Sequence, residues 1–173
     1  KGNVAIGLFT TANARGHLYS ALEHLDRQVV YYDTDSVIYE FDAHNPTHVH
    51  LVEGNYLDDF TDELKGKHIV KFVSGGPKNY GYVLDSPNAV GETEFIKIKG
   101  FCLTRGAPMD QLTLATMEQV VRERGSAKRK ITMEIPSIVR DKRRKLVMNA
   151  DKTRSYQYVF DKGEVLDDFT VLP

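Results

Sequence analysis

Residues 30–39 constrain the local fold of this chain more than any other stretch of its sequence. Apolar and aromatic residues fill both ends of the stretch, and four small polar residues, 33–36, interrupt them. This pattern is typical of a β-hairpin with a tight polar turn. Because side chains two positions apart on an extended strand point to the same face, we expect the carboxylates of Asp33 and Asp35 to share one small volume.

Two carboxylates held close together repel each other and take up protons unless a cation lies between them. Mg²⁺ is the expected cation, because it binds one or two carboxylates together with waters and substrate phosphates. A calcium loop would need further oxygen ligands and a downstream glycine, whereas Val37 and Ile38 occupy those positions. An isolated Asp-x-Asp pair is most simply a turn, so the metal hypothesis depends on the whole string and its flanking strands.

Residues 31–36 read Tyr-Tyr-Asp-Thr-Asp-Ser, which resembles the C motif of family B DNA polymerases, Tyr-x-Asp-Thr-Asp-Ser. Reverse transcriptases carry adjacent aspartates at the equivalent hairpin, and Thr34 separates the two aspartates here. The resemblance implies two catalytic carboxylates, with Asp35 as a direct metal ligand and Asp33 as the metal-binding carboxylate that supports it. The resemblance also implies that the turn is shaped by Tyr31, Thr34 and Ser36.

The same resemblance implies an enzyme, a DNA-directed DNA polymerase. It would transfer a nucleotide from a dNTP to a primer 3′-hydroxyl with two Mg²⁺ ions in the complete protein. The similarity is to the protein-primed branch found in Maverick/Polinton-type transposons, linear plasmids, viruses and phages. The expected partners are a DNA primer-template, a dNTP and a terminal priming protein, with no membrane.

The N-terminal residues 4–27 predict one long helix that lies against the sheet carrying the hairpin. In family B polymerases a helix of this kind leads into the C motif. The apolar positions that recur at three- and four-residue steps are Leu8, Ala12, Tyr19, Leu22 and Leu25.

The segment after the hairpin, residues 42–64, is polar and acidic. Three histidines lie within 44–50, but no cysteine accompanies them and Asn45-Pro46 marks a turn, so a solvated loop fits better than a zinc site. Residues 51–64 then predict either a short acidic helix or an irregular insertion.

Three strands are predicted next, over residues 68–74, 79–84 and 92–99. The expected turns between them lie at 75–77 and 86–88, where glycine, proline and asparagine gather.

Lys78 and Tyr80 would then share one strand face, where they can address a phosphate and a base or sugar together. They resemble the Lys-x-Tyr motif with which protein-primed polymerases steady the primer terminus. Lys97 and Lys99 repeat the alternation before Gly100. We expect a second primer-template contact there, with an exposed edge strand as the alternative.

The net charge of −1 conceals two regions of opposite sign. Eleven acids and one base lie between Glu23 and Glu63, whereas ten bases and three acids lie between Val120 and Lys145. This division suits a nucleotidyl transferase, although two solvated faces would give the same counts. The residues expected to contact phosphates without reading sequence are Arg140, Lys142, Arg143, Arg144 and Lys145. A nuclear localisation patch is the alternative for this run.

The C-terminal part predicts a helix over residues 112–124, ended by Gly125, and short strands at 130–135, 145–149 and 156–160. The expected apolar positions of the helix are Leu112, Ala115, Met117 and Val120. The resemblance makes this small lobe the thumb.

The predicted fold class is α+β. An antiparallel palm-type sheet with its long packing helix, the motif C hairpin and the Lys-x-Tyr strand would occupy residues 1–104. A thumb-like basic α/β lobe would occupy residues 105–173.

A single cysteine, Cys102, excludes an internal disulfide and fits a reducing compartment. No apolar run approaches the ~20 residues of a membrane span, and no signal peptide opens the chain. These features predict an intracellular protein that is not secreted, with the nucleus or a viral replication site both compatible. Because the chain also lacks an initiator methionine, we expect it to be a piece of something longer.

The A and B motifs and the exonuclease domain of the family have no counterpart in these 173 residues. Two-metal chemistry needs carboxylates beyond one hairpin, so we expect the isolated chain to be inactive and its full-length parent to polymerise DNA. The first alternative is a non-catalytic nucleic-acid-binding remnant of a transposon or viral polymerase. The second is a stand-alone metal hydrolase that uses the same carboxylate pair.

Overall fold

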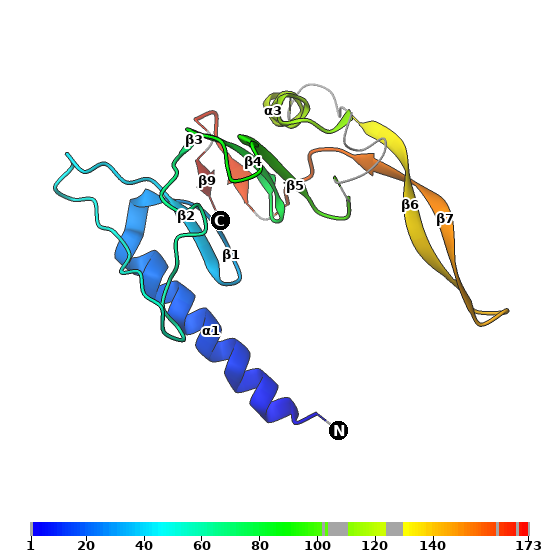
Figure 1. Cartoon of the computed structure of the whole chain (residues 1–173), viewed down its shortest axis with the longest axis horizontal. Helices are drawn as coiled ribbons and strands as arrows, with labels where there is room; N and C mark the ends of the chain where they lie inside the picture. The colour runs from blue at the N-terminus through cyan, green and yellow to red at the C-terminus, as the bar shows by residue number, and fades with distance from the viewer. Residues whose placement is uncertain are drawn as a thin grey trace. The chain divides into compact units, whose positions relative to one another are not determined.

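The computed structural model describes residues 2–101, 103, 111–123, 130–161, 163–168 and 170–172. It divides into two compact units, one up to Gly66 and one from Lys67 onward, and each is described by itself (Figure 1). The predicted α+β class is confirmed, with antiparallel strand pairs and a long N-terminal helix. Several predictions fall outside the described residues, namely Cys102, the boundary at 104/105, the helix end at Gly125 and the bases Arg124, Lys128 and Arg129.

The first unit begins with helix α1, Val4–Leu25, as the sequence predicts. The side chain of Asn3 caps it, because Oδ1 accepts hydrogen bonds from the backbone N–H groups of Ala5 at 3.0 Å and Ile6 at 3.4 Å. A short 3-10 turn, Asp26–Gln28, follows and leads the chain into the hairpin.

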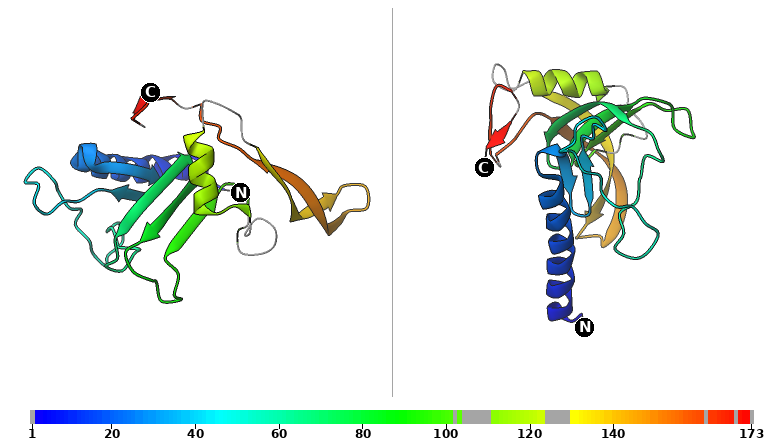
Figure 2. Two further views of the ribbon diagram at one scale, coloured as in Figure 1. Left: turned by 90° about the horizontal axis from the view of Figure 1, so that it is seen from above. Right: turned by 90° about the vertical axis from the view of Figure 1, so that its left-hand side faces the viewer.

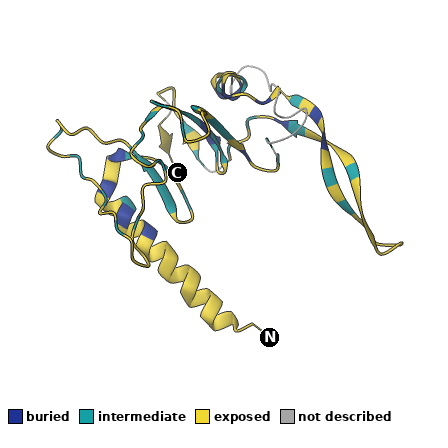
Figure 3. Ribbon diagram, viewed as in Figure 1, coloured by how far each residue is buried: buried dark blue, intermediate teal, exposed yellow. Residues whose placement is uncertain are grey.

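The predicted apolar face of α1 is wrong over most of its length. Leu8, Ala12 and Tyr19 are exposed and Leu22 is half-buried. Of the predicted positions Leu25 is buried, and the other buried residues, Leu18 and Ala21, also lie near the C-terminal end of the helix (Figure 3). The reason is that α1 meets β2 and the 3-10 turn of this unit at that end, so the periodicity of the first turns is not matched by a surface within the unit.

The predicted hairpin is confirmed as strands β1, Val29–Asp33, and β2, Ser36–Tyr39. Its connection is tighter than expected, because Asp33 pairs directly with Ser36 and only two residues lie between the strands. Residues 51–64 form an irregular insertion and not a short acidic helix, so the second of the two predicted alternatives is confirmed. An isolated bridge joins Glu53 to Phe60, and no helix forms in this fully described stretch.

The second unit contains a three-stranded antiparallel sheet in the order β3-β4-β5. The strands are β3, Ile69–Gly76, β4, Asn79–Leu84, and β5, Glu94–Ile98. Helix α3, Leu114–Arg122, lies across one face of this sheet (Figure 2).

Gly81 of β4 allows the close approach of α3 to the sheet. A Cβ atom built at this position would lie 2.6 Å from Leu114 Cδ1 and 2.9 Å from the carbonyl oxygen of Phe95. Both distances are too short, so any side chain here would displace the helix or the neighbouring strand. Leu114 and Val121 of α3 are buried, whereas the predicted core position Ala115 is exposed.

Two 11-residue strands follow, β6, Ile131–Asp141, and β7, Leu146–Tyr156, paired along their full length. The prediction of three short strands in this region is wrong, and residues 157–160 form no strand. The inner part of the β6–β7 hairpin joins β5 and α3 in the core of this unit. That core is formed by Ile98, Leu112, Met117, Val120, Val121, Met133, Ile135 and Tyr156. A small pair, β8, Glu164–Val165, and β9, Val171–Leu172, completes the unit.

Candidate functional site

The hairpin turn of the first unit is organised by Asp33. Its main-chain carbonyl oxygen accepts hydrogen bonds from the N–H group of Asp35 at 2.6 Å and from Ser36 Oγ at 3.1 Å. Its carboxylate oxygen Oδ1 accepts a hydrogen bond from Thr34 Oγ1 at 3.0 Å. The hydroxyls of Thr34 and Ser36 thus both bond to Asp33 within the turn.

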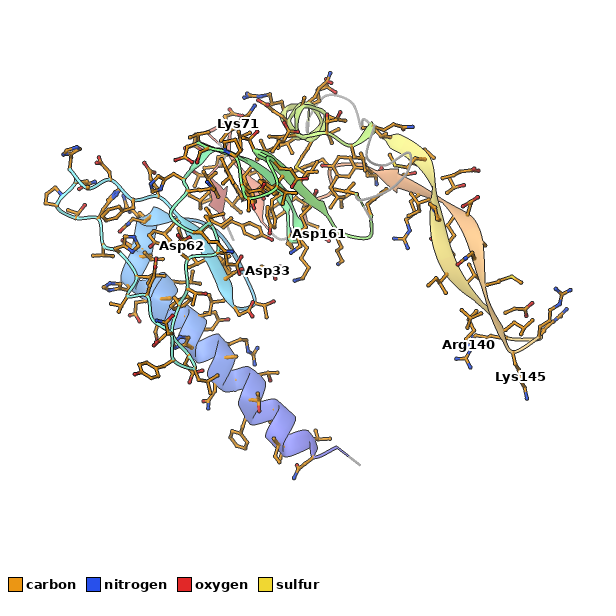
Figure 4. The ribbon with its side chains drawn as sticks, in the orientation of Figure 1. Asp33, Asp62, Lys71, Arg140, Lys145 and Asp161 are labelled. Atoms are coloured by element: carbon orange, nitrogen blue, oxygen red, sulfur yellow. The ribbon has the colours of Figure 1, made fainter. Side chains whose placement is uncertain are left out.

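Asp33 and Asp35 do not lie on one extended strand, contrary to the prediction. β1 ends at Asp33, and Thr34 has a φ of 56°, in the left-handed region, so Asp35 lies in the turn rather than on a strand. Asp33 and Tyr31 are half-buried on one face of β1, whereas Asp35 is exposed. Asp33 therefore pairs with Ser36 at the end of the ladder, and Asp35 is one of the two residues of the turn between them (Figure 4 labels Asp33).

The donor set at this turn restricts the cation that could bind. Among the residues that the structure describes, no group of three or more histidine, cysteine or acidic side chains could hold a metal ion. Two carboxylates of one turn fit Mg²⁺, which takes its remaining ligands from water and substrate phosphates.

A buried glutamine holds the polar loop against the base of the hairpin. The amide of Gln28 donates to the carbonyl oxygens of Glu40 at 2.8 Å and Val49 at 2.9 Å, and its Oε1 accepts from the N–H group of Val49 at 2.8 Å. Among the residues that the structure describes, Gln28 is the one buried polar residue. Sequence reasoning missed it, because its partners are backbone groups 12 and 21 residues away.

Tyr39, at the end of β2, makes a second link to the same loop. Its hydroxyl lies within hydrogen-bond distance of His50 Nδ1, at 2.9 Å, and accepts from the N–H group of Leu51 at 3.4 Å. Burial raises the pKa of Tyr39, the Leu51 N–H lowers it, and the negative charges of Glu53 and Asp62 raise it further. The loop histidine thus takes part in local packing, with its ring edge-on to that of Tyr39.

Lys78 lies in a turn rather than on the predicted strand. β3 continues through Gly76, which pairs with Asn79, so the turn consists of Pro77 and Lys78, and Lys78 has a φ of 57°. The prediction that Lys78 and Tyr80 share a strand face is therefore wrong.

Lys97 is the lysine that shares a strand face with Tyr80. The two residues are directly paired between β5 and β4, and Lys97 Nζ lies 5.8 Å from the centre of the Tyr80 ring, in a cation–π contact. Lys99 is exposed just beyond the end of β5. Gly100 has a φ of 85°, which confirms the predicted glycine turn.

An aromatic row accompanies this pair on the sheet. Phe72, Tyr82 and Phe95 are in register across the three strands, and the rings of Tyr82 and Phe95 stack with centres 5.1 Å apart. Tyr80 stacks between Phe72 and Tyr82. The next residues along the strands, Val73, Gly81 and Ile96, are also paired across the sheet. They lie on its opposite face, which packs against α3.

All five basic residues predicted to contact phosphates lie at the far end of the β6–β7 hairpin (Figure 4 labels Arg140 and Lys145). Asp141 closes this turn, because its Oδ1 accepts from the N–H groups of Arg143 at 2.9 Å and Arg144 at 3.1 Å. The ion pair between Arg144 Nε and Asp141 Oδ2 is long, at 3.9 Å, and exposed, so it contributes little. The turn therefore carries five cations against one acid.

No family model, no curated protein and no solved structure matches the chain. In the part of the chain that the structure describes, none of the helices is both long enough and apolar enough to cross a membrane.

Proposed function

We propose that this chain is part of a family B DNA polymerase, with the turn at residues 33–36 supplying two carboxylates to nucleotidyl transfer. The observation that carries the proposal is the position of the string Tyr-Tyr-Asp-Thr-Asp-Ser. The string spans the two-residue turn of an antiparallel hairpin, and Asp33 and Ser36 are directly paired on either side of that turn. A hairpin tip with two carboxylates and short polar neighbours suits a site that must admit both a primer end and a nucleotide.

The residues of the turn have different roles in this proposal. Asp35, exposed at the tip, is the direct ligand of the catalytic cation. Asp33 is the supporting carboxylate, oriented by the hydrogen bond from the Thr34 hydroxyl. When bound, Mg²⁺ supplies electrostatic stabilisation of the attacking 3′-oxygen and of the leaving pyrophosphate.

The second unit has the binding role in the same proposal. Lys97 binds a phosphate of the primer strand, and the ring of Tyr80 contacts a sugar or base of the same strand. Lys99 and Lys78 are further phosphate contacts. The basic turn of the β6–β7 hairpin holds the product duplex by its phosphates. The palm and thumb designations belong to this proposal.

The proposal includes the inactivity of the isolated chain. One hairpin carries too few carboxylates for two cations about 4 Å apart, so catalysis needs the A and B motifs of a longer parent. We expect the 173-residue chain not to extend a primed template with Mg²⁺ and dNTPs. We expect a longer product of the same reading frame to do so, and Asp35→Asn to lower its rate roughly 10³-fold or more. Extension by the isolated chain, or an active Asp35→Asn parent, would contradict this proposal.

Cation binding can be tested on the chain as it stands. Mn²⁺ should selectively broaden the backbone amide NMR signals of residues 33–36, and Asp35→Asn should remove this broadening. Asp58→Asn is the matched control, because Asp58 is an exposed acid of the same unit. Equal broadening in wild type and Asp35→Asn would show that the turn does not hold the ion.

A non-catalytic nucleic-acid-binding remnant is the second candidate function. The basic turn favours it, because phosphate binding there does not require the carboxylates of the first unit. A parent reading frame without an aspartate-containing A motif would favour this candidate over the enzyme.

A further inference from the structure

The outer half of the β6–β7 hairpin is a two-stranded ribbon without a core of its own. The inner half is buried through Met133, Ile135 and Tyr156, whereas aliphatic side chains farther out are exposed, with Ile138 at 74% and Val147 at 69%. Isolated two-stranded ribbons are marginally stable in water, and exposed aliphatic rows mark contact surfaces.

The strand register sorts the outer residues onto two faces. Directly paired residues of an antiparallel ribbon point to the same side. One face therefore carries two successive pairs, Ile138 with Asn149 and Arg140 with Val147, and all four residues are exposed. The residues of the turn, 142–145, lie beyond this face and carry the remaining cations.

The side chains of this face are those that read base edges in a DNA major groove. Arginine donates two hydrogen bonds to guanine, asparagine pairs with adenine, and small aliphatic groups contact the thymine methyl. The B-form major groove, about 12 Å wide and about 8.5 Å deep, admits a two-stranded ribbon. Four residues of strand, from Ile138 to Asp141, span roughly 13 Å, which is enough to reach the groove floor.

The charges of the ribbon indicate which ligand it binds and how far it can enter a groove. The four cations of the turn, residues 142–145, match the phosphates that line a groove. The next pair on the same face is Pro136 with Asp151, and the exposed Asp151 carboxylate would repel phosphates there. Insertion should therefore stop after two register pairs.

We propose that the outer β6–β7 ribbon enters the major groove of B-form DNA and that Arg140 and Asn149 read base edges there. The proposal rests on the proposed function only in taking duplex DNA as the ligand, and it goes further by naming the groove and a sequence preference. Arg140 is thereby separated from the residues of the turn, which bind phosphates of any sequence. A-form RNA duplexes are excluded, because their major groove is too narrow for side chains to read.

The test uses the whole 173-residue chain and duplexes of random sequence, followed by affinity measurements on selected and scrambled sites. We expect a preference of about tenfold for the selected DNA site. Arg140→Lys, which keeps the charge but loses the bidentate geometry, and Asn149→Ala should each flatten that preference while binding to scrambled DNA changes less than about threefold. Lys142→Ala with Arg143→Ala is the control, and it should weaken binding to all duplexes and lower the salt slope by about 2.

Competitors and alternative ligands complete the test. Methyl green, a major-groove ligand, should displace the chain, distamycin in the minor groove should not, and double-stranded RNA of the selected sequence should bind at least tenfold more weakly. Absence of duplex binding, displacement by distamycin alone, equal RNA binding, or an unchanged preference in both base-reading variants would overturn the proposal. Tighter binding to phosphatidylserine vesicles than to DNA would overturn it too and assign the ribbon to a membrane surface. Asp35→Asn should leave the preference intact, so a failure of the polymerase proposal is distinguishable from a failure of this one.

Discussion

The two hairpins of the chain, β1–β2 and β6–β7, both have an aspartate at the turn but use it differently. At Asp33 the main-chain carbonyl oxygen accepts the backbone N–H bond that closes the turn. At Asp141 the carboxylate does this work, accepting from two backbone N–H groups. The difference shows that an aspartate in a turn is not by itself a functional signal. Asp141 has a structural role, because its carboxylate accepts the backbone N–H groups of its own turn.

The hairpins also differ in what holds them. The β1–β2 hairpin is linked to the following loop by Gln28, whose amide donates to the carbonyl oxygen of Val49, and by Tyr39, whose hydroxyl accepts from the N–H group of Leu51. The β6–β7 hairpin depends on an apolar base and extends beyond it as an exposed ribbon. The first arrangement holds a loop against the base of its hairpin, and the second leaves a long ribbon exposed.

The largest expected effect concerns the apolar base of the second hairpin. Ile135→Ala should lower the free energy of unfolding by about 2–5 kcal/mol, because it removes a buried side chain from the core. Ile138→Ala, three residues farther along the same strand, should change it by less than about 0.5 kcal/mol, because that side chain is exposed. Urea unfolding followed through β6 and β7 amide signals would measure both, and equal losses would refute the division into a buried base and an exposed ribbon.

The next effect concerns the first hairpin. Gln28→Ala removes the hydrogen-bond partner of three partly buried backbone groups and should destabilise this unit by about 1–3 kcal/mol. The rate of hydrogen exchange at the Val49 amide should rise in proportion to this loss of stability. The neighbouring exposed Arg27→Ala serves as the control and should leave exchange at Val49 unchanged.

A smaller effect is expected at the turn of the second hairpin. Asp141→Ala removes the acceptor of two backbone N–H groups and should loosen the turn by about 1 kcal/mol, with faster exchange at Arg143 and Arg144. Asp33→Asn keeps the main-chain carbonyl, so exchange at Asp35 should hardly change. If Asp33→Asn loosened its turn as much as Asp141→Ala does, the contrast between the two aspartates would be lost.

The smallest effect is a pH dependence in the sheet of the second unit. A hydrogen bond from Lys71, and then one from Arg122, hold the pKa of Glu118 below its usual 4.5. A lowered folded-state pKa contributes stability above the unfolded-state pKa, and this contribution is lost as the pH falls through the folded-state value. Lys71→Met should raise the pKa of Glu118 toward 4.5 in a ¹³C NMR titration. An unchanged titration midpoint would show that the pair does not persist in solution.

Local patterns predicted the elements well where one residue type determines one geometry. The polar turn between apolar strands at residues 33–36 and the glycine turn at Gly100 are both as predicted. The prediction for Lys78 was wrong by a single position, because β3 extends through Gly76 and a one-residue shift moves a side chain off the strand.

Other features could not be found from local pattern. Beyond its base most of the β6–β7 ribbon is exposed, and adjacent apolar residues such as Ile138 and Val139 give its sequence no polar–apolar alternation, so one hairpin was predicted as several short strands. Gln28 acts on distant backbone groups, and the exposed first turns of α1 carry an apolar periodicity without a partner in their unit. Of the candidate site, the residues of both turns were predicted, whereas the pairing of Lys97 with Tyr80 required the strand register.

The anchoring of the loop by Gln28 has a practical consequence. One amide fixes both ends of the loop, at Glu40 and Val49, so the residues between them are free to change in number. Loop-closure entropy grows slowly with length, by about 0.6 kcal/mol for each doubling. A fluorescent or affinity tag inserted at Pro46 should therefore leave the acidic turn undisturbed, which makes this loop a suitable attachment point for single-molecule measurements.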